Sequence, residues 1–481
     1  RPIRVEHAEG AQELVSYDAG GRSVELVAAD GGLTKIERDL AGRIIAITTA
    51  ADQTTRYEYD ACGRPVTAID PTGGRTSLTY NADSRVIEMT NPAGDVATTE
   101  YDAVGRVIRR VVPGSGVARY RYDKLGRLVG IQDHRYGQRS FQYDAAGQLT
   151  KITNGVGGIT TYEYDARGRL TKIVDPTGGV TRHTYTELDQ IASVTVPLGR
   201  VTTATYDPAG RQTSQADPDG HITQWVHDAA GREIGMKVDG RWVAKLEPSQ
   251  NARTVVLTDY TGDAHTTHTL VMNLRGQCIR RTTTIDQTEY TTQWEYDVVG
   301  NRTAMIDNAG RRTQYHRDLL GRVIRITHPD LPEIQLSYDA AGRVREAQTD
   351  GQLHTWEYAN GFPVTHTRTD DSGVSRTQIS RDDVGRITAL DGPGGVTKFS
   401  YDDACQLIGA TSPVGQQTWT YDLGGRLIRE TSPSSQRELT YDIAGQLQTI
   451  MDADGTLTQY HYDGQGRRIQ EITPETITDY V

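Results

Sequence analysis

The sequence predicts an all-β protein in which tandem β-hairpins form a long antiparallel sheet that spirals into a hollow, barrel-like shell. Three observations support the hairpin sheet. A short phrase recurs at an almost constant spacing, each repeat contains two turn signals, and the segment before one of the turns alternates between two kinds of side chain. A fixed period through a whole chain is typical of repeat architectures, in which each repeat is one supersecondary unit.

The repeat is clearest at residues 164–170, which read YDARGRL. We write its tyrosine position as s and count the other positions of a repeat from it. The position recurs 22 times, at residues 17, 38, 59, 80, 101, 122, 143, 164, 185, 206, 227, 248, 272, 296, 317, 338, 358, 381, 401, 421, 441 and 462. The spacing is irregular within residues 247–295, which we interpret as drift or a bend, with a docking loop as the alternative. Residues 1–481 are therefore predicted to be a single repeat region.

Each repeat contains two turns. In the first, an aspartate at s+1 can accept hydrogen bonds from backbone amides two residues on, and a glycine at s+4, present in 17 of 22 copies, accepts a left-handed conformation. The second is typified by the Asp-Pro-Thr-Gly of residues 70–73, in which proline presets φ at about −65°. Related turns occur at 91–94, 175–178 and 217–220. Two turns in 21 residues leave strands of about six residues, so the unit is a β-hairpin.

The motif therefore predicts four structural positions in each repeat: tyrosine at s, aspartate at s+1, glycine at s+4 and arginine at s+5. We expect the arginines to pair with the carboxylates of the repeat. In six clear copies the predicted residues are Tyr59, Asp60, Gly63 and Arg64; Tyr101, Asp102, Gly105 and Arg106; Tyr122, Asp123, Gly126 and Arg127; Tyr164, Asp165, Gly168 and Arg169; Tyr338, Asp339, Gly342 and Arg343; and Tyr421, Asp422, Gly425 and Arg426.

One strand of the hairpin has two distinct faces. In residues 160–164, a threonine and two tyrosines alternate with a threonine and a glutamate, which is the period of a strand. Position s−2 is aromatic in 11 of the 22 copies, so we expect ladders of rings across the strands of one face. A platform that stacks on sugars or bases is the functional alternative. In the other strand, Leu170 and Ile173 share a face only if a β-bulge follows the glycine turn.

The number of strands constrains the architecture. Twenty-two hairpins supply 44 strands, and at about 4.8 Å per strand the ribbon would be about 210 Å long. Open sheets rarely exceed about ten strands without curling, so the ribbon must coil, and one turn of it would be about 65 Å across. A mean hydropathy of −0.57 leaves little apolar surface for a second layer, which favours a hollow, polar-lined wall. The alternative is a parallel β-helix with one rung per repeat, although glycine and proline turns suit chain reversals better.

Composition argues against several classes of function. A formal net charge of −11 gives no basic footprint for nucleic acid, and no apolar run reaches the roughly 18–20 residues of a membrane span. We predict no catalytic site, cofactor or metal site, because the recurrent aspartates are turn formers. His265 and His268 have no evident third metal ligand, and Cys62, Cys278 and Cys405 are dispersed, as free thiols are.

The phrase Tyr-Asp-x-x-Gly-Arg-Leu, with Asp-Pro-x-Gly between its copies, resembles the YD repeat of Rhs proteins, which also occurs in the C subunits of insecticidal toxin complexes and in teneurins. The resemblance covers essentially the whole chain. It implies a spiral β-sheet cocoon that encloses a C-terminal toxin domain of the same polypeptide. It also implies synthesis in the bacterial cytoplasm and delivery into a target cell, commonly by type VI secretion, with a secretion spike and chaperone or adaptor proteins as partners.

Rhs cores typically close with a plug segment and an aspartate-dependent self-cleavage site, and neither motif occurs in these residues. We therefore expect the chain to be a fragment of a longer polypeptide, with the toxin and the N-terminal domain encoded elsewhere in the gene. The predicted function is a non-enzymatic encapsulating shell of a polymorphic toxin. The alternatives are an extracellular adhesion or carbohydrate-binding protein, and a carbohydrate-active enzyme on a β-helix.

Overall fold

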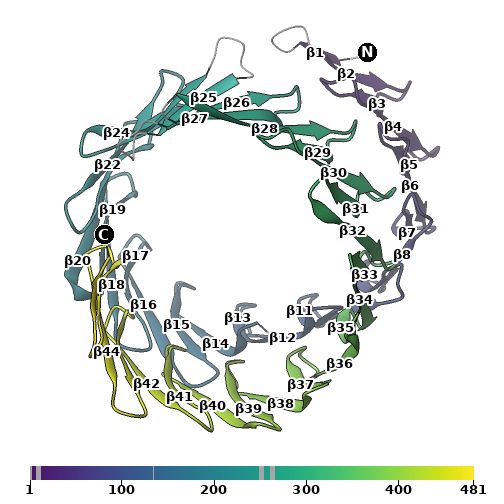
Figure 1. Cartoon of the computed structure of the whole chain (residues 1–481). Helices are drawn as coiled ribbons and strands as arrows, with labels where there is room; N and C mark the ends of the chain where they lie inside the picture. Colours follow the sequence, from purple (N-terminus) through teal and green to yellow (C-terminus); the bar gives the residue numbers. More distant parts are fainter. Residues whose placement is uncertain are drawn as a thin grey trace. The chain divides into compact units, whose positions relative to one another are not determined.

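The computed structural model describes residues 3–6, 12–133, 135–248, 254–259, 266–285 and 287–480. Almost all of these residues lie in short strands or in the turns between them, and the strands belong to one antiparallel sheet of 46 strands (Figure 1). The prediction of an all-β chain of tandem antiparallel hairpins is therefore confirmed. One 3₁₀ turn, η2 (Pro197–Gly199), interrupts the described strands.

Contacts between Cα atoms divide the chain into two compact units. Unit 1 comprises Arg1–Thr99, His227–Met236 and Trp242–Arg376, and unit 2 comprises Glu100–Val226, Lys237–Arg241 and Thr377–Val481. Each unit thus combines stretches of sequence that lie far apart in the chain.

The strands of unit 1 are β1 (Ile3–Glu6), β2 (Gln12–Tyr17), β3 (Ser23–Val27), β4 (Leu33–Arg38), β5 (Ile44–Thr48), β6 (Thr54–Tyr59), β7 (Pro65–Ile69), β8 (Arg75–Tyr80), β9 (Val86–Thr90), β25 (Thr254–Asp259), β26 (Thr266–Met272), β27 (Cys278–Ile285), β28 (Thr288–Tyr296), β29 (Arg302–Ile306), β30 (Arg312–Arg317), β31 (Val323–His328), β32 (Leu331–Tyr338), β33 (Val344–Thr349), β34 (Gln352–Ala359) and β35 (Phe362–Asp370).

The strands of unit 2 are β11 (Val107–Val112), β12 (Gly116–Tyr122), β13 (Leu128–Asp133), β14 (Gly137–Tyr143), β15 (Leu149–Asn154), β16 (Ile159–Tyr164), β17 (Leu170–Val174), β18 (Val180–Tyr185), β19 (Ile191–Val196), β20 (Arg200–Tyr206), β21 (Gln212–Ala216), β37 (Ile387–Gly392), β38 (Gly395–Tyr401), β39 (Leu407–Ser412), β40 (Gly415–Tyr421), β41 (Leu427–Thr431), β42 (Gln436–Tyr441), β43 (Leu447–Asp452), β44 (Leu457–Tyr462), β45 (Arg468–Ile472) and β46 (Ile477–Asp479). Five strands cross a boundary between the units: β10 (Val96–Tyr101), β22 (Ile222–His227), β23 (Glu233–Val238), β24 (Arg241–Pro248) and β36 (Gly373–Arg381).

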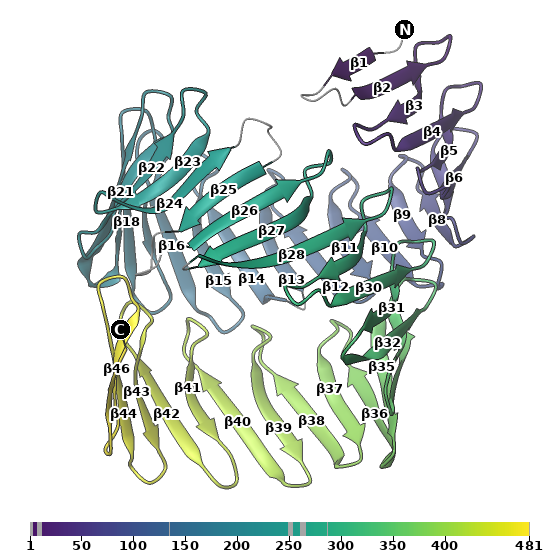
Figure 2. The ribbon, with the colours of Figure 1, turned by 45° about the horizontal axis from the view of Figure 1, so that its top comes forward.

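The 22 repeats account for β2 to β45, one hairpin per repeat, and β1 and β46 flank them. Figure 2 shows the regular succession in β37–β42, where each strand runs antiparallel to the next. The ladder also continues through the described part of the irregular stretch 247–295, because β25 pairs with β26, β26 with β27 and β27 with β28.

Both kinds of turn have the same backbone hydrogen bonds, although their sequences differ. In the first kind, Asp60 N donates to the Arg64 carbonyl and Gly63 N donates to the Asp60 carbonyl. In the second kind, Asp70 N donates to the Gly74 carbonyl and Gly73 N donates to the Asp70 carbonyl. The fourth residue of each five-residue turn has a left-handed backbone conformation, with φ values of 79° at Gly63 and 88° at Gly73. Glycine recurs at this position because a side chain there would be strained.

A β-bulge follows the first turn, as expected from the spacing of Leu170 and Ile173. Tyr162 lies opposite Ile173 and Tyr164 opposite Leu170, with a register shift between Glu163 and Tyr164. Two residues lie between Leu170 and Ile173 in β17, whereas one lies between Tyr162 and Tyr164 in β16. Both apolar side chains therefore share the face of the tyrosines. The same shift recurs one residue before most tyrosine slots, for example at Tyr122 in β12 and Tyr338 in β32.

The predicted ladder of rings is only partly correct. Tyr120 lies opposite Ile131, and Phe141 opposite Ile152, so the direct cross-strand partner of these rings at position s−2 is an aliphatic side chain. In these repeats rings and aliphatic side chains therefore alternate along the tyrosine face, which we define as the sheet face that carries positions s and s−2.

The sheet has almost no buried core. Among the described residues the buried apolar side chains are small ones, Ala46, Val117, Ala304, Val384 and Ala410, and no large side chain is fully buried. The chain exposes 28249 Å², whereas a compact protein of 53.0 kDa would expose about 17,700 Å². An excess of this size means that both faces of a single sheet remain accessible to solvent.

Candidate functional site

The aspartate of the first turn holds the turn together. In the repeat at slot 59, one carboxylate oxygen of Asp60 accepts hydrogen bonds from the amides of Cys62 and Arg64, each at 2.9 Å. Its other oxygen accepts a hydrogen bond from Nε of Arg64 at 2.7 Å. We call this set of bonds the turn clasp. It satisfies polar groups of the turn within a single repeat, as the residue types at s+1 and s+5 suggested.

The arginine of the clasp also reaches the next repeat. The Arg64 guanidinium lies over the Tyr80 ring, 4.6 Å from its centroid, and the Tyr80 hydroxyl donates to the carbonyl of Pro65 at 2.6 Å. A cation over an aromatic face and a hydrogen bond to the backbone are each worth roughly 0.5–1.5 kcal/mol. Each clasp therefore fastens one hairpin to the next.

The structure brings the four predicted positions together in each of the six copies. The aspartates Asp60, Asp102, Asp123, Asp165, Asp339 and Asp422 accept hydrogen bonds from Nε of Arg64, Arg106, Arg127, Arg169, Arg343 and Arg426 at 2.6–2.7 Å. The glycines Gly63, Gly105, Gly126, Gly168, Gly342 and Gly425 have φ values of 79–89°. The tyrosines Tyr59, Tyr122, Tyr164, Tyr338 and Tyr421 donate to a carbonyl 14 or 15 residues earlier, and Tyr101 occupies the same position at the end of β10.

These hydrogen bonds perturb the carboxylates. The amide of Arg64 and then its guanidinium hold the pKa of Asp60 below its ordinary value, and Arg169 does the same to the pKa of Asp165. Both aspartates are consequently charged throughout the neutral range, bound within their own turns. Carboxylates held in this way are poorly suited to general acid or base catalysis.

In two repeats in which glutamine replaces arginine at s+5, the glutamine makes the connection to the next repeat. Gln148 donates to the carbonyl of Gly168 at 3.1 Å, and Gln277 donates to the carbonyl of Gly300 at 2.8 Å. The side chain at s+5 thus contacts the following turn in both variants. Coupling between neighbours is typical of repeat proteins, whose stability is approximately a sum of repeat and nearest-neighbour terms.

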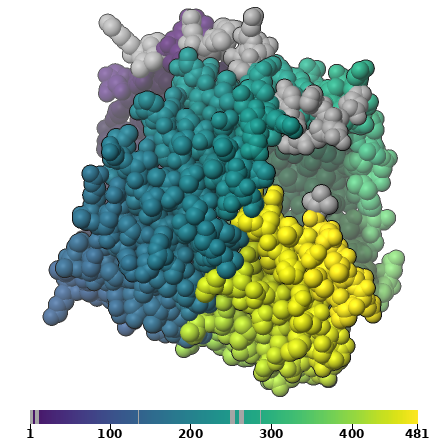
Figure 3. Space-filling view, turned by 90° about the vertical axis from the view of Figure 1, so that its left-hand side faces the viewer, coloured from purple at the N-terminus to yellow at the C-terminus, as the bar shows by residue number. Residues whose placement is uncertain are grey.

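In unit 2, turns from residues 100–226 meet turns from residues 377–481, which appear blue and yellow in Figure 3. The Gln138 amide donates to the carbonyl of Asp403 at 2.9 Å, and Nδ2 of Asn154 donates to the carbonyl of Leu423 at 3.0 Å. We call this contact the unit 2 seam. The residues that meet in it are more than 260 positions apart in the sequence.

A row of glycines forms one side of the unit 2 seam. Gly116, Gly137, Gly158 and Gly179 recur every 21 residues at position s−6. A Cβ at Gly158 would lie 2.1 Å from the Leu423 carbonyl oxygen, and one at Gly116 or Gly137 would lie 2.2 Å from a backbone carbonyl oxygen. At Gly179 the corresponding distance, to the Ile443 carbonyl oxygen, is 2.9 Å. Only glycine therefore lets the two backbones approach this closely. The periodic glycine was visible in the sequence, but it was indistinguishable there from an ordinary turn residue.

The corresponding contact in unit 1 is ionic. Arg343 donates from Nη1 to Asp95 at 2.7 Å while its Nε bonds to Asp339, and the Asp95 side chain is 10% exposed. Arg275 pairs with Asp30 and donates to the carbonyl of Val298 at 2.7 Å. Breaking one half of such a partly buried pair is costly, because the other charge is left without its partner.

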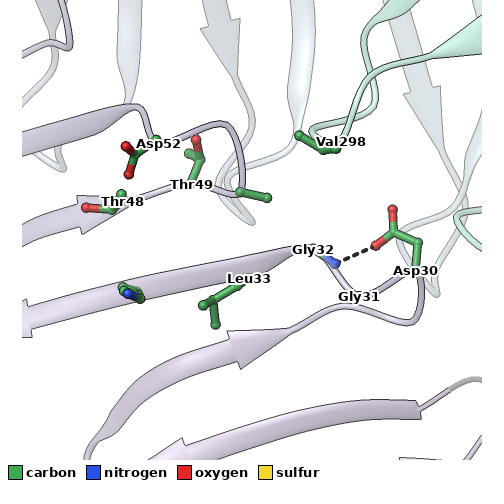
Figure 4. A pocket seen from close by; sticks show the side chains of 10 residues that line it. Asp30, Gly31, Gly32, Leu33, Thr48, Thr49, Asp52 and Val298 are labelled. Atoms are coloured by element: carbon green, nitrogen blue, oxygen red, sulfur yellow. Dashed lines mark hydrogen bonds between the residues drawn. The ribbon is translucent and has the colours of Figure 1, made fainter.

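A cavity of about 480 Å³ adjoins this ionic contact in unit 1. Figure 4 shows Val298 facing the turns of Asp30 and Thr49 across it, with Asp30 bound to the amide of Gly32. The cavity has polar side chains but no cluster of potential metal ligands, and no group of three such side chains occurs elsewhere in the described residues. We interpret it as a notch between turns.

Of the two histidines that the sequence did not favour as metal ligands, His268 bonds to Oγ1 of Thr283 at 3.0 Å, whereas His265 lies outside the described residues. Sequence reasoning missed a different pair, His354 and His366, whose ring nitrogens lie 2.9 Å apart. It also missed the strained turns in which Ser84, Asp189 and Cys405 replace glycine at s+4, with φ values of 62–65°.

In the part of the chain that the structure describes, no helix is long and apolar enough to cross a membrane.

The RHS repeat model of protein families matches residues 38–76, 80–117, 101–139, 143–180, 164–201, 206–240, 296–330 and 441–478, just over half of the chain. The chain belongs to the RHS repeat family. Membership confirms the resemblance read from the Tyr-Asp-x-x-Gly-Arg phrase.

One relative and one similar structure carry the names of toxins. The double-stranded DNA deaminase toxin A of Burkholderia cenocepacia (strain H111) is 33% identical over 99 residues, which is 20% of this RHS chain and 7% of the relative. The Photorhabdus luminescens Tc holotoxin pore aligns with 98% of the chain and 30% of its own chain, at 15% identity and a TM-score of 0.55. A complex of TcdB2, TccC3 and Cdc42 aligns over the same shares at 16% identity and a TM-score of 0.43. The RHS chain therefore spans only a small part of these relatives' length, and the pore shares its fold.

Proposed function

We propose that this RHS chain is a non-enzymatic wall that encloses a toxin domain of its own polypeptide until delivery. The observation that carries the proposal is the construction of the chain as a single sheet, which exposes about 1.6 times the surface of a compact protein. A sheet of 46 strands whose described residues include no fully buried large side chain covers a large area for its mass. Family membership and the toxin names of the relatives support the identity of what is covered.

The turn clasps support the same function. A wall without a core needs another source of stiffness, and each clasp ties its turn internally while its arginine and the next tyrosine tie two hairpins together. The seams then join turns that lie far apart in the sequence. The aspartates of the motif are engaged in this structural role, which supports a wall rather than a hydrolase.

For delivery, we propose synthesis in the bacterial cytoplasm and export by type VI secretion in interbacterial competition. The partners would be a secretion spike and a chaperone or adaptor protein. The bacterial deaminase toxin among the relatives supports the toxin context. The acidic net charge supports a wall that does not itself bind nucleic acid.

The test is denaturing mass spectrometry of the full-length product purified under native conditions, before and after mild protease treatment. We expect a second, smaller polypeptide that co-purifies and resists protease until the wall is unfolded. A single protease-accessible species would contradict enclosure. Adhesion or carbohydrate binding by an exposed face would then become the leading function.

A further inference from the structure

The β34–β35 hairpin lacks the turn clasp. β34 and β35 are joined through Ala359-Asn360-Gly361-Phe362, with φ values of 51° at Asn360 and 80° at Gly361. The repeat has Ala359 where the motif has aspartate and Pro363 where it has arginine, so neither half of the clasp is available. The next strand, β36, is one in which the chain passes from unit 1 to unit 2.

The same hairpin carries three stacked rings on the tyrosine face. Trp356 occupies position s−2 and lies directly opposite His366, whereas Tyr120 and Phe141 at this position lie opposite isoleucines. The His354 and His366 rings are 5.2 Å apart and within 9° of parallel, and Trp356 stacks on His366 at 5.1 Å. Nδ1 of His354 and Nε2 of His366 are 2.9 Å apart, which is a hydrogen bond.

This hydrogen bond survives only while the pair binds fewer than two protons. One nitrogen must donate and the other accept, which is possible for two neutral rings and for one neutral and one protonated ring. With both rings protonated, both nitrogens carry hydrogen and two cations face each other at van der Waals distance. Both imidazoles are half-buried, and burial together with the His354 charge lowers the pKa of His366.

Among the described residues, no carboxylate is bound to either imidazole to offset the second proton. Arg368 lies opposite His354 and pairs with Asp370 at 2.6 Å, and Ala347 lies opposite His354 on β33. The other charged groups on or next to the strands packed around the pair are also engaged: Arg345 with Glu346, Arg343 with Asp339 and Asp95, Arg376 with Glu357, and Arg381 with the Gly385 carbonyl.

We propose that the His354–His366 pair makes the β34–β35 hairpin an acid-sensitive joint in the wall, closed at neutral pH and loosened as the pH falls below about 6.5. The closed hairpin accepts one proton, whereas the opened hairpin accepts two. The proton deficit of the closed form therefore favours opening in acid. In a hairpin with a clasp, such as β16–β17, the clasp would oppose such opening, and here it is absent.

Hydrogen–deuterium exchange of the intact protein at pH 7 and pH 5, corrected for the intrinsic pH dependence of exchange, tests the joint. If one imidazole is barred from protonation, the opening equilibrium of residues 352–370 should rise up to roughly 25-fold between these pH values. The hairpin of residues 159–174 contains no histidine and is the internal control. An equal response in the two hairpins would overturn the proposal.

Two variants separate the pair from general acid effects. His366→Gln keeps a side chain that can donate and accept, but leaves a single titrating ring, so the response of residues 352–370 should fall to that of the control hairpin. His461→Gln removes a histidine from the opposite sheet face, one residue before slot 462, and should leave the response intact. A His366→Gln protein that still loosens in acid as the wild type does would refute the role of the pair. Imidazole titration by NMR gives a second readout, in which the wild-type pair should take up its two protons in well-separated steps.

Discussion

The unit 2 seam can be tested with Gly158→Ala, because the added methyl group should separate the two turns that meet there. Gly158 has no left-handed backbone conformation, so alanine there is free of backbone strain and the cost is purely steric. The new Cβ would lie 2.1 Å from the carbonyl oxygen of Leu423, and the backbones would have to separate by more than 1 Å to restore an ordinary contact distance of about 3.4 Å.

The expected penalty can be worked out from two contributions. Overpacking a tightly packed site costs about 1–3 kcal/mol. Separation by more than 1 Å also breaks the 3.0 Å hydrogen bond from Asn154 to Leu423, which is worth about 0.5–1.5 kcal/mol. Because the two effects act on the same contact, they are coupled, and we expect about 2–3 kcal/mol in total for Gly158→Ala.

Hydrogen exchange is the suitable assay, because a long repeat chain need not unfold in two states. Amides of the turns at residues 154–158 and 422–425 should exchange roughly 30–150 times faster in Gly158→Ala, whereas the centres of β15 and β16 should change little. Gly394→Ala is the control, because Gly394 also lies in a turn of unit 2 without a left-handed conformation, but has no atom within 4 Å of its added Cβ. Unchanged exchange at residues 422–425 in Gly158→Ala would refute the seam.

Three further predictions concern single repeats. Tyr143→Phe removes the 2.7 Å hydrogen bond from the hydroxyl to the Leu128 carbonyl and should destabilise β13–β15 by about 1 kcal/mol. Hydrogen exchange measures this loss, with Tyr136→Phe as the control. An equal effect of the two substitutions would contradict the prediction. Ser84→Gly should raise local stability by about 0.5–1 kcal/mol, because it relieves a left-handed conformation at φ 62°, and a decrease would show that the hydroxyl matters more than the strain. The hydrogen bonds that lower the pKa of Asp165 contribute stability that is fully present above about pH 4 and is lost as the pH falls through the lowered pKa. Circular dichroism of acid unfolding should show this loss. Asp165→Asn should weaken the pH dependence of hydrogen exchange in residues 164–170.

The turns could be predicted from sequence because their chemistry is local. Aspartate at s+1 and glycine at s+4 are the residue types that a five-residue ring with a left-handed position requires, and Asp60 and Gly63 occupy it as expected. The bulge could also be anticipated, since Leu170 and Ile173 share a face only if one residue is skipped. The residues opposite the rings at s−2 could not be predicted, because the register of strand pairing decides whether Tyr120 lies opposite another ring or opposite Ile131.

The seams lay beyond sequence reasoning for a different reason. Which turn meets Gly158 depends on how the sheet curves over about 265 residues, and no local pattern encodes that curvature. The row of glycines at s−6 was the available signal, yet the preceding turn already explains a glycine at that place. Likewise, His354 and His366 looked scattered, because only the pairing of β34 with β35 brings them together.

Clasps and seams should therefore control different properties of the protein. A clasp couples a hairpin to its neighbour in the sequence, so its loss is confined to adjacent repeats. A seam couples turns from distant stretches, so its loss separates two edges while each hairpin keeps its own clasp. Removing the Asp165 carboxylate should thus fray residues 164–170 and leave the seam at Leu423 protected. Gly158→Ala should do the opposite, and this reciprocal pattern would be absent if the sheet were stabilised as one cooperative core.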